Sequence, residues 1–240
     1  MKNKQLFTAI LLFITSIAIA QTEEGSRVIL ENNGLSNTAF YVYAPVFQAK
    51  GIYKDLSEVK NNYPEQVMSS LMSVTSQAWE DFNTLGGTKE AEQKEATFFE
   101  AIENMDKDKN YFDLRCKLEY EANGEKFAVI KFYLTRQGAE PICGAYAFQE
   151  VDNRWYKTAT PLSTSIAFML MTFDETKLDL LFQKKQNVSP FISELLDKSL
   201  ENDKISLVKL ISISDKWIEN KQQNLVDYFF DKNSWINKKL

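Results

Sequence analysis

The stretch FDLRCKLEYEANGEKFAVIKFYLTR, Phe112 to Arg136, decides the fold of this chain. Its centre, Ala122-Asn123-Gly124-Glu125, is typical of a two-residue hairpin, because Asn and Gly tolerate the positive φ angles of a type I′ turn. Apolar and β-branched residues on both sides predict two antiparallel strands, Phe112–Glu121 and Lys126–Arg136. In this register Cys116 lies opposite Lys131.

Two further turn signals extend the hairpin, one near Gln137–Glu140 and one at Asp152-Asn153. They predict strands at Pro141–Val151 and Arg154–Thr158, and so an antiparallel β-meander of about four strands. Strand alternation predicts one face that carries Leu114, Cys116, Leu118, Tyr120, Phe127, Val129 and Tyr133. The second strand places Ala128, Ile130, Phe132 and Leu134 on the other face, so we expect both sides of that strand to be covered.

The segment before the hairpin changes to a helical period. Apolar residues at positions 67, 71, 74, 78 and 82 predict one amphipathic helix over Pro64–Phe82, which Gly86-Gly87 ends. Thr88 is a suitable N-cap for a second helix that reaches Met105. Nearer the N-terminus, Gln21–Gly34 is polar and predicts a loosely held arm, and the aromatic segment Thr38–Phe47 predicts a short strand.

The segment after the meander predicts a helical tail. Ile166–Phe173 is an unbroken apolar run that fits a buried helix begun by Ser163 or a strand, and we favour the helix because a helical pattern continues from Thr176 to Lys185. Further helices are predicted from Ser189-Pro190, from the cap Asp203 and over Trp217–Phe230. The expected fold class is therefore α+β, with N-terminal amphipathic helices, the meander and a C-terminal helical tail. The expected parts are a leader at 1–20, an arm and extended segment at 21–63, an α+β domain at 64–160 and a tail packed on that domain at 161–240.

The first 20 residues have the pattern of a secretory signal peptide. Lys2 and Lys4 precede an apolar run from Leu6 to Ile19, and Ala18-Ile19-Ala20 supplies small residues before a cut at Gln21. The run is about 14 residues long against the roughly 20 that cross a bilayer, so we expect no stable membrane span after cleavage. Gln21 is not the cysteine that a lipoprotein needs. The expected location is periplasmic or secreted.

Composition excludes several functional classes. The chain has no histidine, which removes Ser- and Cys-based triads and His-based zinc sites. Acidic residues outnumber basic ones by 33 to 28, and loss of Lys2 and Lys4 with the leader takes the net charge from −5 to −7, which disfavours nucleic acid as a partner. Gly86-Gly87 lacks the lysine of a phosphate loop. We predict no catalytic residue, no metal site and no cofactor.

The two cysteines of an exported chain would usually form a disulfide. The hairpin register argues against a bridge, because Cys116 and Cys143 fall on strands with one strand between them. Two strand spacings are about 9.5 Å, which exceeds the roughly 7 Å that a bridged pair of Cα atoms allows. We expect both thiols to be free and buried.

Aromatic residues make up 13% of the chain and gather in the meander. If the sheet curves, these side chains could line a cavity for a ligand, although ordinary core packing also accounts for them. The candidate ligand-binding residues are Tyr120, Tyr133, Tyr146, Phe148 and Trp155. Glu119 and Glu121 share a strand face with Lys117, and we interpret the three as a solvent-facing row.

Two N-terminal helices that lead into a meander, with the closing strand Asn153-Arg154-Trp155-Tyr156-Lys157, resemble the NTF2-like (cystatin-like) superfamily. The resemblance covers Pro64–Thr160. It implies a cone-shaped α+β domain, and members of the superfamily include ligand-binding modules, oligomerisation domains and a few enzymes that use Asp, His or Tyr. No catalytic residue of those enzymes matches a position here, and the tail after Pro161 departs from the family pattern.

The sequence favours an exported, non-enzymatic protein that binds a small apolar or aromatic ligand, or an envelope protein, through a curved aromatic-lined sheet. One alternative is a hydrolase or isomerase that uses Tyr and carboxylates, which requires a buried carboxylate of raised pKa near Tyr120, Tyr133 or Tyr146. The other is a structural or interaction protein that presents its C-terminal helices, above all Trp217–Trp235.

Overall fold

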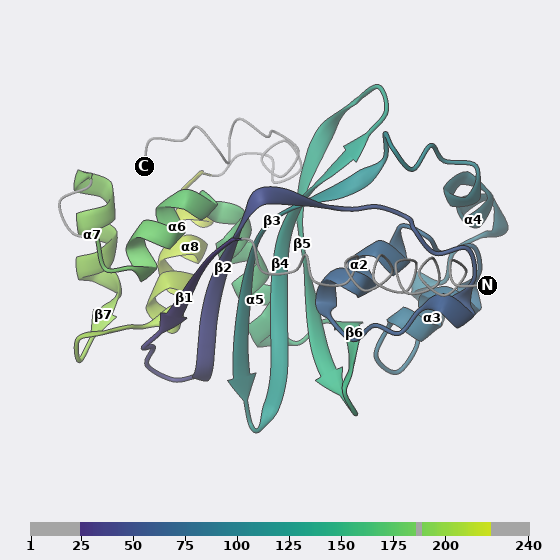
Figure 1. Ribbon diagram of the computed structural model, residues 1–240. Helices are drawn as coiled ribbons and strands as arrows, with labels where there is room; N and C mark the ends of the chain where they lie inside the picture. Colours follow the sequence, from purple (N-terminus) through teal and green to yellow (C-terminus); the bar gives the residue numbers. More distant parts are fainter. Residues whose placement is uncertain (1–24, 186–188, 222–240) are drawn as a thin grey trace, which may run out of the picture.

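The computed structural model describes residues 25–185 and 189–221 and has an α+β fold (Figure 1). Its centre is an antiparallel sheet of six strands in the order β1-β2-β3-β4-β5-β6, so each strand pairs with its neighbour in sequence. The strands are β1 Gly25–Leu30, β2 Ser36–Ala49, β3 Tyr111–Ala122, β4 Glu125–Arg136, β5 Ala139–Val151 and β6 Arg154–Thr158.

The predicted meander is confirmed as β3 to β6. Asn123 and Gly124 have φ angles of 55° and 80°, which the type I′ turn requires, and Cys116 pairs with Lys131. The predicted number of about four strands was wrong, because β1 and β2 extend the sheet beyond β3 to give six. The segment Gln21–Gly34, expected to be a loose arm, contains β1, whose pairing with the aromatic strand β2 satisfies those of its backbone groups that face β2.

The N-terminal helices are shorter than predicted. The expected helix Pro64–Phe82 is two helices, α2 Pro64–Leu71 and α3 Gln77–Asn83, because the Ser76 side chain accepts a hydrogen bond from the backbone N–H of Trp79 and begins a new helix. The second predicted helix starts at Ala96 and not after Thr88. The remaining elements here are the 3₁₀ turns η2 Leu56–Glu58 and η3 Glu90–Glu92 and the helix α4 Ala96–Glu103.

The C-terminal part is helical as predicted, with one short hairpin. The apolar run Ile166–Phe173 is helical up to Thr172, and its helix begins at Pro161 with Thr160 as the cap, not at Ser163. Asp203 caps no helix, since it lies with positive φ in the turn of a small hairpin. The elements are α5 Pro161–Thr172, α6 Glu175–Phe182, α7 Pro190–Ser199, β7 Leu200–Glu201, β8 Lys204–Ile205 and α8 Leu207–Lys221.

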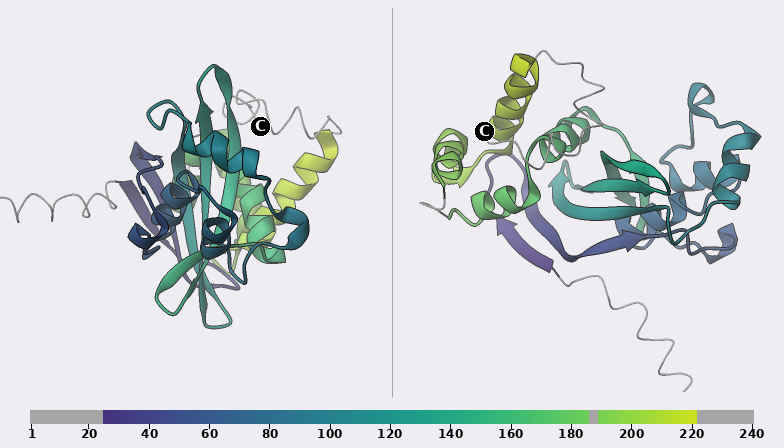
Figure 2. Two further views of the ribbon diagram at one scale, coloured as in Figure 1. Left: turned by 90° about the vertical axis from the view of Figure 1, so that its right-hand side faces the viewer. Right: turned by 90° about the horizontal axis from the view of Figure 1, so that it is seen from above.

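Helices cover both faces of the sheet, as the apolar pattern of the second meander strand predicts. Figures 1 and 2 show α2 and α3 on one side and α5 to α8 on the other. The α5 side packs on a core that includes Phe40, Leu118 and Val129, and the α2 side on one that includes Met68, Ile130 and Phe148. The sheet is therefore the middle layer of the protein.

One predicted face assignment was wrong. Leu114 pairs with Phe132 and Cys116 pairs with Lys131, so Arg115 is an extra residue in β3, a β-bulge. The bulge turns Leu114 to the α2 side, where it packs with Phe132, while Cys116 faces α5. A single inserted residue reverses the alternation, which sequence spacing alone does not reveal.

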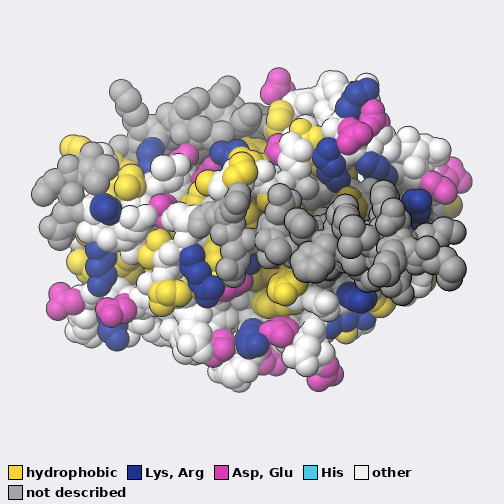
Figure 3. All heavy atoms as spheres, viewed as in Figure 1, with side chains coloured by type: hydrophobic (Ala, Val, Ile, Leu, Met, Phe, Trp, Pro, Cys, Tyr) yellow, Lys and Arg dark blue, Asp and Glu magenta, His cyan; other side chains and the backbone are white. Residues whose placement is uncertain are grey.

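Some predictions lie outside the described residues. The leader Met1–Ala20 is one of them, and Trp217–Phe230 begins in α8 but then leaves the described part of the chain, as does most of Trp217–Trp235. Within residues 25–185 and 189–221, no helix has both the length and the apolar character that a membrane crossing requires. On the face shown in Figure 3, acidic and basic side chains are interspersed.

Candidate functional site

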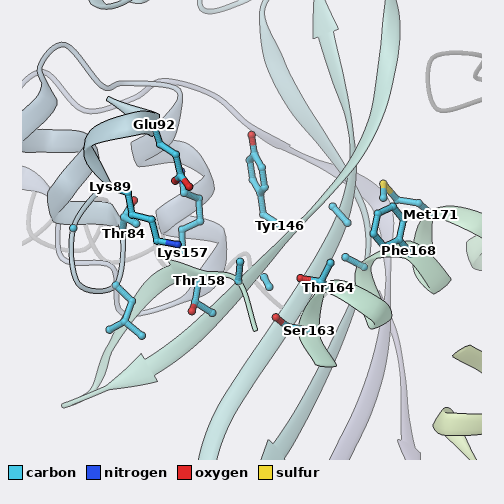
Figure 4. A pocket seen from close by; sticks show the side chains of 16 residues that line it. Thr84, Lys89, Glu92, Tyr146, Lys157, Thr158, Ser163, Thr164, Phe168 and Met171 are labelled. Atoms are coloured by element: carbon cyan, nitrogen blue, oxygen red, sulfur yellow. The ribbon is translucent and has the colours of Figure 1, made fainter. Parts of the chain in front are cut away.

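A cleft of about 440 Å³ lies at the β6 edge of the sheet, where β6 ends and the chain turns into α5 (Figure 4). Its floor is Ala145–Ala147 of β5 together with Lys157 and Thr158 of β6. The first turns of α5 form one wall and Thr84–Glu92 forms the other. Two parts of the chain that are far apart in sequence, Thr84–Glu92 and Ala145–Met171, therefore meet here.

Local hydrogen bonds hold both walls. The Thr160 side chain accepts from the backbone N–H of Ser163, and the Ser163 hydroxyl accepts from the N–H of Thr160, which fixes the start of α5. On the other wall, the N–H of Leu85 donates to the carbonyl of Lys157 at 2.9 Å. The Asp81 carboxylate accepts from the N–H of Thr88 at 3.1 Å. The cleft is thus bounded by backbone that its own residues fix in place.

Small side chains make the cleft hollow. Four of the residues that line it are alanines, namely Ala145, Ala147, Ala159 and Ala167. Larger apolar groups lie around them, with Tyr146 on one face of β5 and Phe168 and Met171 of α5 on the other (Figure 4). The alanines on the α5 face leave the space beside Phe168.

The polar groups of the cleft are already partly engaged. The Lys157 ammonium donates to the carboxylate of Glu80 at 2.6 Å, and Glu80 is buried. The Lys157 ammonium also lies 5.9 Å from the centre of the Tyr146 ring. Burial, followed by the negative charge of Glu80, raises the pKa of Tyr146 above its ordinary value, so the phenol stays neutral at physiological pH. These groups can orient a ligand by hydrogen bonds.

The structure separates the five aromatic candidates. Tyr146, Phe148 and Trp155 lie on the α2 side of the sheet, and of these Tyr146 lines the cleft while Phe148 and Trp155 are buried in the core. Tyr120 and Tyr133 lie on the α5 side and are also buried, with Tyr120 stacked on Phe127 at 5.3 Å. The candidates therefore do not form one aromatic-lined surface.

Sequence reasoning missed the other cleft residues, above all Lys157, Thr164 and Phe168. A signal for the site was nevertheless present. The predicted strand Arg154–Thr158 is much shorter than the preceding strand and leaves part of that strand's outer edge uncovered. The segment that follows Pro161 therefore starts close to this uncovered edge.

A second polar cluster is buried beneath the N-terminus of α6. The Lys131 ammonium is bonded to Glu175 Oε2 at 3.0 Å and to the carbonyl of Phe173 at 2.9 Å, and Arg115 Nη2 lies 2.7 Å from Glu175 Oε1. Burial alone would raise the pKa of Glu175, but the charges of Lys131 and Arg115 outweigh it and lower this pKa to about 2. Glu175 is therefore ionised and does not supply the carboxylate of raised pKa that the enzyme alternative requires near Tyr133.

Of the row Glu119, Glu121 and Lys117, which was predicted to face solvent, Lys117 is buried, whereas Glu119 and Glu121 are half-buried. Lys117 is 7% exposed, and its ammonium lies 2.7 Å from Glu65 Oε1 of α2 and 2.9 Å from Glu119 Oε1. Glu65 also accepts a hydrogen bond from the Tyr43 hydroxyl at 2.6 Å. This network joins α2 to the sheet, because a buried ammonium requires a charged partner.

The two cysteines are free and buried, on β3 and β5 with β4 between them. Burial raises the pKa of the Cys143 thiol to about 11, which keeps it protonated and weakly nucleophilic. Within the described residues, no group of three or more Cys, Asp or Glu side chains is placed to hold a metal ion.

Comparison of the chain with protein-family models, with curated proteins and with solved structures finds no match. The resemblance to the NTF2-like superfamily therefore stays a prediction.

Proposed function

We propose that the protein is an exported binding protein that receives an apolar or aromatic group of its ligand in the cleft at the β6 edge of the sheet. The observation that carries this proposal is the hollow of about 440 Å³ that alanines leave between α5 and Thr84–Glu92. Ligand pockets usually have volumes of about 300 to 1,000 Å³ and combine apolar walls with a few polar groups.

The arrangement of side chains supports an aromatic or branched apolar group. On the α5 face of β5, Ala145, Ala147 and Ala167 leave space beside Phe168, so a flat group there could contact that ring, while Tyr146 lies on the other face of the strand (Figure 4). Thr158, Thr164 and Lys157 offer hydroxyl and ammonium donors in the lining of the cleft. Such donors would fix the orientation of a bound group, while the apolar contacts supply most of the affinity.

The alternative of a Tyr- and carboxylate-based enzyme has weaker support. Glu80 and Glu175 are the buried carboxylates nearest to the candidate tyrosines, and both are ion-paired with lysines. A general acid needs a pKa close to the working pH, and Glu175 has one of about 2. The export part of the proposal depends on the leader pattern of Met1–Ala20 and the cut before Gln21.

A cleft-filling variant tests the proposal. Thr164 is exposed on α5 and lines the cleft, so Thr164→Trp should fill the hollow without disturbing the core. The probe is an anilinonaphthalene sulfonate dye, whose fluorescence reports binding to the purified protein. Val208→Trp, at a 64% exposed position of α8, adds the same side chain away from the cleft.

We expect Thr164→Trp to weaken dye binding at least about tenfold, which corresponds to about 1.4 kcal/mol, while Val208→Trp binds as the unmodified protein does. Near-UV circular dichroism should be the same for all three proteins. Equal dye affinity in Thr164→Trp and the unmodified protein would contradict the proposal, as would a folded protein that binds no dye.

A further inference from the structure

The strand β5 is longer than the strand that covers its outer edge. β5 has 13 residues, whereas β6 has five and pairs only with Ala147–Val151. Within the described chain, the stretch Ala139–Tyr146 has β4 on one side and no strand on the other. None of its backbone groups is bonded to a loop or helix of residues 25–185 and 189–221. This part of β5 is an open sheet edge.

The exposure of β5 changes where β6 ends. Ala147, Phe148 and Gln149 are buried, whereas Gly144, Ala145 and Tyr146 are only half-buried. Pro141 marks the far end of the usable edge, because proline has no N–H and is a common means of blocking strand addition. The remaining open stretch is Ile142–Tyr146.

The open edge leads into the cleft and is not on a flat flank of the molecule. Ala145 and Tyr146 belong both to the open stretch and to the floor of the cleft. At this place α5 covers one face of the sheet and Thr84–Glu92 lies beside the other (Figure 4). The end of the open edge at Ala145 and Tyr146 therefore lies at the bottom of a groove with a wall on each side.

We propose that an extended peptide segment of a partner protein adds to this edge as a strand in line with β6 and inserts one apolar side chain into the cleft. The inference rests on the proposed function and names its ligand as a peptide. Unpaired backbone donors and acceptors are satisfied best by another extended backbone, which is the mode of recognition called β-augmentation.

The alternation of side chains in a strand defines the peptide further. Successive side chains of an added strand point to opposite faces of the sheet. Those on the α5 face meet Ala145, Ala147 and Ala167, which leave room for Leu, Met or Phe. Those on the other face meet Tyr146 and Lys157, where a smaller polar side chain fits.

A short peptide suits this edge better than a second copy of the chain. The open stretch has room for about five residues, or roughly 17 Å of strand, at about 3.3 Å per residue. A stable dimer usually buries about 800 Å² on each partner, which such a short pairing with Pro141 at its end does not provide. A peptide gains additional contacts because it is held between the two walls.

The test uses a library of synthetic peptides of about eight residues, long enough to pass the open stretch at both ends, with alternating Thr and one central Leu, Met or Phe. Binding to the full chain is measured by fluorescence anisotropy. The best binder is then made in two forms, with N-methyl groups on either of the two alternating sets of amides. One set would face β5 and the other would face away, so the two forms are matched controls.

We expect one N-methylated form to lose at least about tenfold in affinity and the other to bind like the parent, because only one set donates to β5. The parent should also slow hydrogen exchange of amides in Ile142–Tyr146. Thr164→Trp should weaken binding of the parent peptide to the protein, and Val208→Trp should leave it unchanged.

The outcomes separate this inference from the proposed function. If both N-methylated forms bind like the parent, or if the dye binds in the cleft and no peptide of the library does, the strand-addition inference is overturned while the cleft remains a ligand site. Unchanged exchange of the amides in Ile142–Tyr146 when the peptide is bound, or a concentration-dependent dimer that excludes the peptide, also overturns it. If Thr164→Trp changes neither the affinity for the dye nor the affinity for any peptide, both proposals fail.

Discussion

For the buried pair of Lys131 and Glu175 we predict that a second substitution raises the free energy of unfolding of the first variant, whereas most second substitutions lower it further. Glu175→Gln removes the negative charge that faces two cations, Lys131 at 3.0 Å and Arg115 at 2.7 Å. The Arg115 side chain is 32% exposed and can turn towards solvent, whereas the Lys131 side chain is 1% exposed and cannot. The main cost of the variant is therefore an uncompensated ammonium inside the protein.

The magnitude follows from the pKa of Glu175. Each pKa unit corresponds to about 1.4 kcal/mol, so a decrease from 4.5 to about 2 indicates a contribution near 3 kcal/mol at neutral pH. Removal of one partner of a buried pair usually costs about 3 to 5 kcal/mol, which is the same order. Glu175→Gln should lower the free energy of unfolding by about 3 kcal/mol.

Lys131→Met should cost less, because Glu175 then keeps Arg115 as its partner. In the double variant Lys131→Met, Glu175→Gln, no uncompensated ammonium remains in the core. We expect the double variant to be more stable than Glu175→Gln alone by about 1 to 2 kcal/mol. Urea unfolding at pH 7, followed by the fluorescence of buried Trp79 and Trp155, measures all four proteins.

Acid supplies a second measurement on the same pair. Because the pKa of Glu175 is lower in the folded state, its contribution to stability is complete above about pH 4.5 and is lost as the pH falls towards 2. The stability difference between the unmodified protein and Glu175→Gln should shrink over that interval. A double variant less stable than Glu175→Gln, or a difference that does not depend on pH, would refute the reasoning.

Three further predictions concern separate parts of the chain. Asn83→Ala should lower the free energy of unfolding by about 3 kcal/mol in urea melts. The reason is that Asn83 Oδ1 accepts hydrogen bonds from two buried donors, Asn61 Nδ2 and Ser70 Oγ, each at 2.9 Å, and both donors lose their acceptor in the variant. An unchanged midpoint would contradict this account. Gly124→Ala should cost about 1 to 2 kcal/mol, since the residue has a φ of 80°, and a neutral effect would argue against the type I′ turn. Mass spectrometry of protein exported by a bacterial host should show a mature chain that begins at Gln21, and a chain that retains its first 20 residues would count against export by a cleaved leader.

Much of the candidate site was outside the reach of sequence reasoning. Aromatic enrichment drew attention to the meander and included Tyr146, which lines the cleft, but composition does not say on which face a residue lies or whether a neighbour covers it. The bulge at Arg115 and the early end of β6 decide those points, and both depend on how neighbouring strands pair. Lys117, interpreted as facing solvent, meets Glu65 only because α2 packs across the sheet.

The sequence by itself determined those features whose signals lie within a few residues of one another. The Asn123-Gly124 hairpin and the start of α7 at Ser189-Pro190 belong to this group. For the run Ile166–Phe173 the sequence only favoured a helix over a strand, and the structure decided it. The tertiary structure alone decided the pairing of β2 with β3, the ion pair of Lys131 with Glu175 and the cleft between α5 and Thr84–Glu92. Backbone angles and caps are set by near neighbours, whereas burial, charge pairing and hollows depend on which distant segments come together when the chain packs.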